Sequence, residues 1–230
     1  LVHAIISPWD FPSCFIACYL RNKLGLPSQT LESYFRCEHK YWSRIIQKKA
    51  FPQNVPDFKA FDPFDEESEN LDFPLPFWLK PIKSFESHLG FLIQSKSDLQ
   101  QALRKIRESI HYLGDAFDEA IELSEITKEA GYPPSYYCLA ESLISTPDQV
   151  TVEGYCFKGH CKILGIVDTK KVRGGTSFQS YLYPSQIPSS IREKVSEITK
   201  AVMRKTVLSH GPFNIEFFYN RQTQDVYILE

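Results

Sequence analysis

The stretch Phe213-Asn214-Ile215-Glu216-Phe217, with Val226-Tyr227-Ile228-Leu229-Glu230 after it, places two carboxylates inside otherwise apolar strands. An unpaired buried carboxylate is costly, so each needs a cation, a hydrogen-bond network or a strand face open to solvent. If the two strands form a hairpin, both side chains can point to one spot, where carboxylate oxygens suit Mg²⁺ carrying nucleotide phosphates. The alternative is two ordinary solvent-facing glutamates.

The residues before this pair predict a second sheet element and a helix. Residues 149–157 and 161–168 are rich in branched and aromatic side chains and are joined at Lys158-Gly159-His160, which predicts a hairpin. Ser190 and Glu193 form a capping box that opens a helix. The buried stripe of that helix is expected to be Ile191, Val195, Ile198 and Val202. His210-Gly211-Pro212 is expected to end it.

The first half of the chain predicts a similar unit. Two short strands, residues 76–80 and 90–94, bracket a polar loop. Ser97 forms a capping box with Gln100 and opens a helix. Its packed face is expected to hold Leu99, Leu103, Ile106 and Ile110. Helical sequence continues over residues 111–134, and residues 136–141 predict a further strand.

Helices are also expected at the start of the chain, over residues 12–24 and about 28–49. Residues 52–74 are expected to form a loop, because four prolines and the acidic run 65–69 interrupt any regular pattern. Two groups of strands, each followed by a helix, indicate an α+β fold with two subdomains and antiparallel sheets.

Composition excludes several classes of protein. The 230 residues are 43% apolar, enough for a sizeable core, and carry 26 basic and 28 acidic side chains for a net charge of −2. Such a chain offers no broad positive field, so nucleic acid is not expected as a partner. No apolar run approaches the ~20 residues that cross a bilayer, so no membrane association is expected and the location is predicted to be cytoplasmic.

The six cysteines show none of the usual zinc spacings. Cys14, Cys18, Cys37 and His39 can be imagined as four metal ligands, but their spacing is not a usual pattern. Cys156 and Cys161 flank the predicted turn and can face each other across the hairpin. In a reducing compartment we expect that pair to stay open.

A second chemical signal is Lys80, at the end of an apolar strand and directly before Pro81. The loop after it, residues 83–90, can fold over an anion through backbone N–H groups and hydroxyls. A lysine at a strand end is common, and Lys40, inside an amphipathic helix, says less by itself.

Taken in order, these features resemble the ATP-grasp superfamily over nearly the whole chain. Lys80-Pro81 resembles the second lysine strand of the family, and residues 83–90 resemble its mobile phosphate loop. Glu141-Ser142-Leu143-Ile144 resembles the linker that binds adenine. Gln149 begins a segment, Gln-Val-Thr-Val-Glu-Gly, that resembles the ribose-binding strand. Within the superfamily, the chain resembles carboxylate–amine ligases of the carnosine-synthase and biotin-carboxylase-like kind.

The resemblance implies a role for each matching residue. Lys40 and Lys80 would hold the α- and β-phosphates, with Ser87 and His88 in the loop above the phosphates. Glu141 and the backbone of Leu143 or Ile144 would meet adenine. The metal ligands would be Glu216 and Glu230, and Lys170 would lie near the γ-phosphate. The expected cofactors are ATP and Mg²⁺, bound in a cleft between the two subdomains.

Three departures from the family pattern stand out. Gln149 replaces a glutamate that usually accepts the ribose hydroxyls, and an amide oxygen accepts more weakly than a carboxylate. The phosphate loop is poor in glycine. The asparagine and arginine expected just after Glu230 are not in the sequence.

The expected organisation is a piece of a larger protein. Residues 1–50 would be the end of a pre-ATP-grasp domain and linker helices, 51–145 the first ATP-grasp subdomain, and 146–230 the second. The expected activity is ADP-forming activation of a small carboxylate as an acyl-phosphate for attack by an amine or thiol. The alternative is an inactive ATP-binding regulatory or scaffold module. The oligomeric state stays open, a homodimer included.

Overall fold

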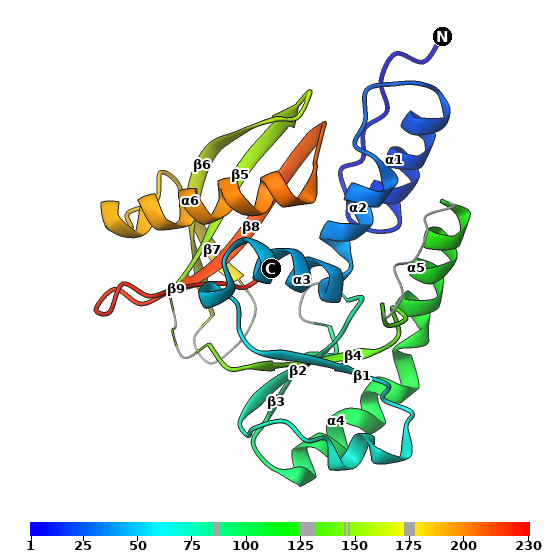
Figure 1. Cartoon of the computed structure of the whole chain (residues 1–230), viewed down its shortest axis with the longest axis vertical. Helices are drawn as coiled ribbons and strands as arrows, with labels where there is room; N and C mark the ends of the chain where they lie inside the picture. Colours follow the sequence, from blue (N-terminus) through cyan, green and yellow to red (C-terminus); the bar gives the residue numbers. More distant parts are fainter. Residues whose placement is uncertain (85–87, 125–131, 145, 147, 173–177) are drawn as a thin grey trace. The chain divides into compact units, whose positions relative to one another are not determined.

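A computed structural model describes residues 1–84, 88–124, 132–144, 146, 148–172 and 178–230 (Figure 1). The chain divides into two compact units. Unit 1 comprises Leu1–Cys37, Ile45–Val55 and Ile144–Glu230, and unit 2 comprises Glu38–Arg44 and Pro56–Leu143. Each unit has its own antiparallel sheet, as the two strand groups in the sequence predict.

Unit 2 is built on a four-stranded sheet in the order β1-β4-β2-β3. Its strands are β1 (Phe58–Phe61), β2 (Phe77–Pro81), β3 (Phe91–Ile93) and β4 (Cys138–Ser142), and its helices are η2 (Glu66–Asn70), α4 (Lys96–Ser109) and α5 (His111–Leu123). The strands predicted at 76–80, 90–94 and 136–141 are therefore confirmed as β2, β3 and β4, each within two residues at either end.

The core of unit 2 lies where α4 packs on β2 and β3. Leu99, Leu103, Ile106 and Ile110 are buried against strand residues such as Leu79, as their helical spacing predicts. The predicted capping box at Ser97 is wrong. Helix α4 begins after Ser95, whose side chain accepts a hydrogen bond from the Asp98 amide at 3.2 Å. Two serines two positions apart each precede a polar residue at +3, and the backbone geometry selects the first.

The loop predicted over residues 52–74 is only partly a loop. It contains β1, which pairs with the edge of β4 through the register Phe58↔Glu141 to Phe61↔Cys138. Pro56 and Pro63 lie outside the strand, where they remove no ladder hydrogen bond. The partner strand therefore decides the conformation of a segment whose local composition favours a loop.

Unit 1 is built on a five-stranded sheet in the order β7-β6-β5-β8-β9. Its strands are β5 (Asp148–Phe157), β6 (His160–Lys171), β7 (Phe178–Leu182), β8 (Gly211–Tyr219) and β9 (Val226–Ile228). Its helices are α1 (Ser13–Lys23), α6 (Ser189–Thr206) and η1 (Pro52–Asn54), with most of α2 (Leu31–Glu38) and the second half of α3 (Lys40–Ala50). The helix predicted over 28–49 is split, because the His39 ring accepts a hydrogen bond from the Trp42 amide and caps α3.

The two faces of this sheet differ in chemistry. One face packs on α6, and Figure 1 shows that helix lying along the sheet. Its buried stripe of Ile191, Val195, Ile198 and Val202 confirms the sequence prediction. Val150 and Phe217, a cross-strand pair, belong to this apolar face. The alternate residues point to the other face, which carries polar and charged side chains. We call it the polar face of unit 1, and define it by Gln149, Thr151, Thr169, Lys171 and Glu216.

Both ends of α6 differ from the sequence prediction. Pro188 is the N-cap and no side chain caps the helix, so the predicted Ser190–Glu193 capping box is wrong. The helix ends at Thr206, and Val207 adopts a left-handed conformation with φ of 56° before His210-Gly211-Pro212 is reached. The edge strand β7 is not predicted from the sequence, because its residues are exposed and mix polar with aromatic side chains.

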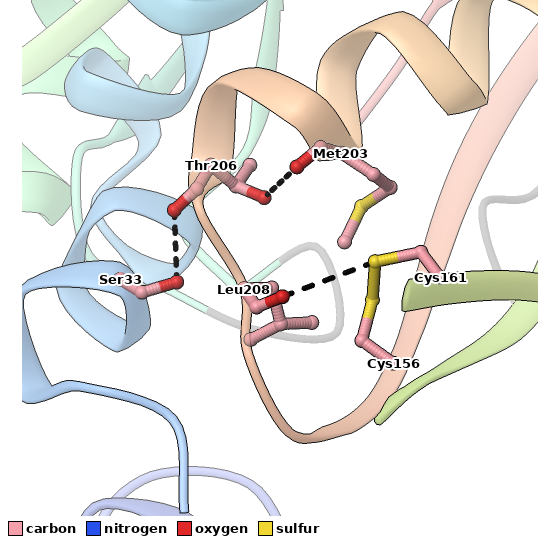
Figure 2. Close-up of a disulfide and its surroundings, with 6 residues drawn as sticks. All are labelled: Ser33, Cys156, Cys161, Met203, Thr206 and Leu208. Carbon is pink, nitrogen blue, oxygen red and sulfur yellow. Dashed lines mark hydrogen bonds between the residues drawn. A yellow bond between two sulfur atoms is a disulfide. The ribbon is translucent and has the colours of Figure 1, made fainter. Parts of the chain in front are cut away.

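The β5–β6 hairpin confirms the predicted turn and corrects the prediction for its cysteines. Lys158 and Gly159 both have positive φ, 50° and 78°, as a two-residue hairpin turn requires. Cys156 and Cys161 lie opposite each other in the register and form a disulfide, rather than the open pair expected. Figure 2 shows Met203 and Leu208 beside it, with the Leu208 carbonyl oxygen 3.9 Å from Cys161 Sγ.

Candidate functional site

The lysine strand of unit 2 ends in a buried ion network. Lys80 Nζ lies 3.0 Å from Glu141 Oε2, across the β2–β4 pair. Arg44, on α3, places Nε 2.6 Å from Glu141 Oε1 and Nη2 3.1 Å from Oε2. All three side chains are buried. The structure thus brings together Lys80 and Glu141, both singled out in the sequence, and adds Arg44 to them.

The charges of this network determine the ionisation of Glu141. Burial alone would raise its pKa, but the neighbouring Arg44 and Lys80 charges and their hydrogen bonds together lower the pKa to about 2. The carboxylate is therefore ionised at neutral pH. Removing one member of a buried ion pair leaves an uncompensated charge, which typically costs about 3–5 kcal/mol. Glu141 consequently holds Lys80 and Arg44 in fixed positions at the end of β2.

Lys40 is connected to the segment that follows β2. It is the first residue of α3 and is buried, and its Nζ donates to the Ser84 carbonyl oxygen at 2.7 Å. The neighbouring Lys83 is also buried, with Nζ 2.7 Å from Glu38 Oε2. Four buried basic side chains therefore come from the first turns of α3, the end of β2 and the segment that follows it: Lys40, Arg44, Lys80 and Lys83.

The other nucleotide residues predicted in unit 2 are placed only in part. Ser87 lies outside the described residues. His88 is exposed in the turn before β3. The Ser142 amide donates to the Asp57 carbonyl oxygen at 2.9 Å, which ties the end of β4 to the segment before β1. Leu143 is the last residue of unit 2 and Ile144 the first of the next part of unit 1.

The polar face of unit 1 holds the predicted ribose and metal residues. Gln149 is 3% exposed, and its Nε2 donates to Glu216 Oε2 at 3.1 Å. Glu216 is half-buried and lies two strand positions from Phe218, the cross-strand partner of Gln149. Gln149 and Glu216 therefore lie diagonally on adjacent strands and touch through their side chains.

A β-bulge brings Glu230 opposite Glu216. The Glu216 carbonyl oxygen accepts from both Leu229 N, at 2.8 Å, and Glu230 N, at 3.4 Å, while Glu216 N donates to Glu230 O at 2.9 Å. Two residues thus oppose one, as in a bulged antiparallel pair. In a regular register Leu229 alone would oppose Glu216, and Glu230 would belong to the other face. The bulge therefore sets the backbone of Glu230, as well as that of Leu229, opposite Glu216.

The structure distinguishes the two lysines at the end of β6. Lys170 is exposed, and strand alternation points it away from the polar face. Lys171 is half-buried, with Nζ 4.7 Å from the centre of the Phe218 ring. Burial lowers the pKa of Lys171, and the charge of Glu216 opposes that change. Of the two lysines, Lys171 is the one whose charge interacts with that of Glu216, and the role of Lys170 near the γ-phosphate stays a prediction.

The donor groups present fit Mg²⁺ and nucleotide better than a transition metal. In the part of the chain that the structure describes, no three His, Cys, Asp or Glu side chains form a metal cluster. The set Cys14, Cys18, Cys37 and His39 is therefore not supported as a metal site. Glu216 and Glu230 offer hard oxygen ligands, and Mg²⁺ commonly binds one or two carboxylates plus phosphate oxygens.

Two surface grooves lie elsewhere in the units. One, of about 320 Å³, is lined in unit 1 by residues 3–6 and 210–212 and by the outward side chains Tyr155 and Phe157. The other, of about 520 Å³, is lined in unit 2 by tyrosines 41, 132 and 137 and by β1. None of the described residues that are predicted to bind the nucleotide lines either groove.

The comparison with protein families decides the classification. The ATP-grasp domain model matches residues 73–230, more than half of the chain. The chain belongs to the ATP-grasp family. No curated protein matches it in a sequence comparison.

Solved structures support the same fold. Biotin carboxylase from Campylobacter jejuni, described as a β-γ-ATP complex, has a TM-score of 0.74 at 15% identity over 100% of this chain and 48% of its own. L-amino acid ligase from Bacillus licheniformis has a TM-score of 0.68 at 16% identity, covering 94% and 45%. D-alanine–D-alanine ligase from Bacillus anthracis complexed with ATP has a TM-score of 0.62 at 17% identity, covering 93% and 61%. The ATP-grasp chain thus spans between about half and three fifths of the length of these proteins.

The sequence patterns of this ATP-grasp chain did not single out two residues of the candidate site, Arg44 and Lys171. Arg44 lies four positions after Lys40, a spacing that puts both on one face of α3, so helical periodicity could have indicated it. Lys171 could not be chosen over Lys170 without the strand register, because adjacent residues of a strand face opposite sides.

No described helix is long and apolar enough to span a membrane.

Proposed function

We propose that this ATP-grasp chain binds Mg-ATP and contributes to an ADP-forming ligase reaction on a small carboxylate. The observation that carries the proposal is the bulged pairing of Glu216 with Glu230, which sets the backbones of two acidic residues opposite each other. Glu216 is on the polar face of unit 1, and its side chain accepts a hydrogen bond from Gln149. The match of the ATP-grasp domain model supports the nucleotide.

Residues of both units are assigned to the nucleotide. In unit 2, Lys40 and Lys80 supply positive charge for the α- and β-phosphates, and Glu141 keeps Lys80 in place through its 3.0 Å ion pair. The segment 141–144 is assigned to adenine. In unit 1, Gln149 is assigned to the ribose, and Glu216 and Glu230 to Mg²⁺. The proposal includes the boundaries expected from the sequence, near residue 50 before the first ATP-grasp subdomain and near residue 145 between the two subdomains.

ATP supplies the phosphoryl group that activates the acid. A substrate carboxylate oxygen attacks the γ-phosphorus, and the bond to the β–γ bridging oxygen breaks to release ADP. An amine, or a thiol, then attacks the acyl carbon, and inorganic phosphate leaves. The side chains of this chain take no covalent part. Lys171 neutralises phosphate charge near Glu216, and the buried Lys40 and Lys80 keep the phosphates in position. Catalysis therefore depends on positioning and charge neutralisation.

The relatives guide the choice of substrates to test. The solved structures include an L-amino acid ligase and a D-alanine–D-alanine ligase, whose names describe the joining of amino acids. Identity of 16–17% to these proteins supports the fold alone. Amino acids and other small acids are therefore the first candidates, with small amines as acceptors.

Calorimetry tests the nucleotide proposal. The whole protein should bind ATP only when Mg²⁺ is present, and Lys80→Ala should weaken that binding at least tenfold. Lys59→Ala is the matched control, because Lys59 lies in the same sheet but is exposed. Absence of Mg-ATP binding by the unmodified protein would contradict the proposal. Phosphate and ADP release with pairs of acids and amines tests catalysis, and Mg-ATP binding without any such release would favour an inactive nucleotide-binding module.

A further inference from the structure

The hydrogen bond to Glu216 determines how the side-chain amide of Gln149 is oriented. Its Nε2 lies 3.1 Å from a Glu216 oxygen. An ionised carboxylate only accepts hydrogen bonds, so the NH₂ end must face it and the oxygen must face elsewhere. That Oε1 atom is buried and has no hydrogen-bond partner among the described residues. A buried acceptor without a partner is costly, which indicates that a donor group belongs there.

A second buried polar atom lies next to it. Thr169 is the cross-strand partner of Gln149 on β6, so both side chains stand on the polar face of unit 1. Thr169 is 8% exposed, and its Oγ1 likewise has no partner within the described part of the chain. An amide oxygen that needs a donor therefore stands beside a hydroxyl that can both donate and accept. A ligand hydroxyl can satisfy both atoms, since it donates to one and accepts from the other.

We infer that Gln149 is a positioning residue that couples the Glu216 carboxylate to a hydroxyl-binding pair, Gln149 Oε1 and Thr169 Oγ1. One end of the amide fixes the metal-binding carboxylate, and the other end binds a ligand hydroxyl. A glutamate at this position would lack the donor. This inference rests on the proposed function, in which the hydroxyl belongs to the ribose of ATP.

Three variants separate the two ends of the amide. Gln149→Leu removes both donor and acceptor, Gln149→Glu keeps an acceptor and removes the donor, and Thr169→Val removes only the neighbouring hydroxyl. Two quantities are measured by calorimetry. One is the Mg²⁺ concentration that half-saturates ATP binding, and the other is the ratio of the Kd values of 2′,3′-dideoxy-ATP and ATP.

Gln149→Leu should raise the half-saturating Mg²⁺ concentration about tenfold, given the usual strength of hydrogen bonds to charged groups. It should also abolish the preference for ATP over the dideoxy nucleotide. Gln149→Glu should raise the half-saturating Mg²⁺ concentration but keep the preference for ATP. Thr169→Val should reduce the preference for ATP without changing the half-saturating Mg²⁺ concentration, and Thr169→Ser should keep the preference of the unmodified protein.

Each other result has a defined meaning. Wild-type Mg²⁺ dependence in both Gln149 variants would overturn the inference while leaving the proposed function intact. If Gln149→Glu binds ATP at the same or a lower half-saturating Mg²⁺ concentration than the unmodified protein, the Glu216 carboxylate needs no amide donor. That result would also overturn the inference. An unmodified protein that does not bind Mg-ATP would instead overturn the proposed function, and the coupling with it.

Discussion

Two carboxylate environments in this chain differ in what surrounds the charge. In unit 2, Glu141 is buried with Arg44 and Lys80 within 3.1 Å, and its pKa is lowered to about 2. In unit 1, Glu216 is half-buried, accepts from the neutral amide of Gln149 and lies opposite a second carboxylate, Glu230. The first environment stabilises the ionised carboxylate within the fold itself. The second is suited to an added cation, so the two sites should respond differently to substitution.

The largest effect is expected at Glu141. Glu141→Gln leaves Arg44 and Lys80 buried without their counter-charge, so the free energy of unfolding should fall by about 3–5 kcal/mol. Urea denaturation of the unliganded protein measures it. Glu69→Gln is the matched control, because Glu69 pairs with Arg107 at the surface, where such pairs contribute less than about 1 kcal/mol. Equal losses for the two variants would contradict the account.

The pH dependence of stability tests the same network without changing its shape. The pKa of Glu141 is lowered from 4.5 in the unfolded chain to about 2. Its contribution, on the order of 3 kcal/mol, should therefore be fully present above pH 4.5 and be lost as the pH falls toward 2. The difference in unfolding free energy between the unmodified protein and Glu141→Gln should shrink over that range. A difference that stays constant from pH 6 to pH 2 would refute the lowered pKa.

A smaller effect is expected at the disulfide, on the apolar face of unit 1. Cys156 and Cys161 are five positions apart, so the cross-link closes a short loop and should stabilise the protein by roughly 2 kcal/mol. Reduction should lower the unfolding free energy by that amount and leave Mg-ATP affinity unchanged, since Cys156 belongs to the face opposite Gln149. Cys37→Ser, which changes an exposed cysteine outside the disulfide, is the control. Identical denaturation curves with and without reductant would show that the thiols stay open, as the sequence predicts for a reducing compartment.

The smallest effect separates the two lysines of β6. Lys171→Ala should weaken Mg-ATP binding by several-fold, because its charge lies near Glu216. Lys170→Ala, on the exposed side of the strand, should change the affinity by less than about twofold. The reverse order would support the sequence-based choice of Lys170 and contradict the register argument.

The sequence predicted local elements better than contacts between them. The stripe on α6 and the turn at Lys158-Gly159 depend on neighbouring residues, and both are confirmed. Strand β1 was missed because its pairing with β4 joins Phe58 to Glu141, far away in the chain. The Arg44–Glu141 pair, 97 positions apart, was missed for the same reason.

The candidate site shows a similar limit. Residue types indicated Glu216 and Glu230 as candidates, since carboxylates in apolar strands are unusual, and the family resemblance indicated Gln149. What they contact depends on strand register, and one bulge at Leu229 or one step between Lys170 and Lys171 changes the face on which a side chain lies. Sequence patterns alone do not locate bulges, so these choices required the structure.

The most direct test of the account is Mg²⁺-dependent ATP binding by Glu216→Gln and Glu230→Gln. Each variant removes one carboxylate of the proposed metal site, so ATP affinity at fixed Mg²⁺ should fall at least tenfold while the unfolding free energy of the unliganded protein changes by less than about 1 kcal/mol. Glu153→Gln, on the same face of β5 but opposite Asn214, is the control and should bind normally. Unaltered Mg-ATP affinity in both Glu216→Gln and Glu230→Gln would contradict the metal site and the ligase activity proposed from it.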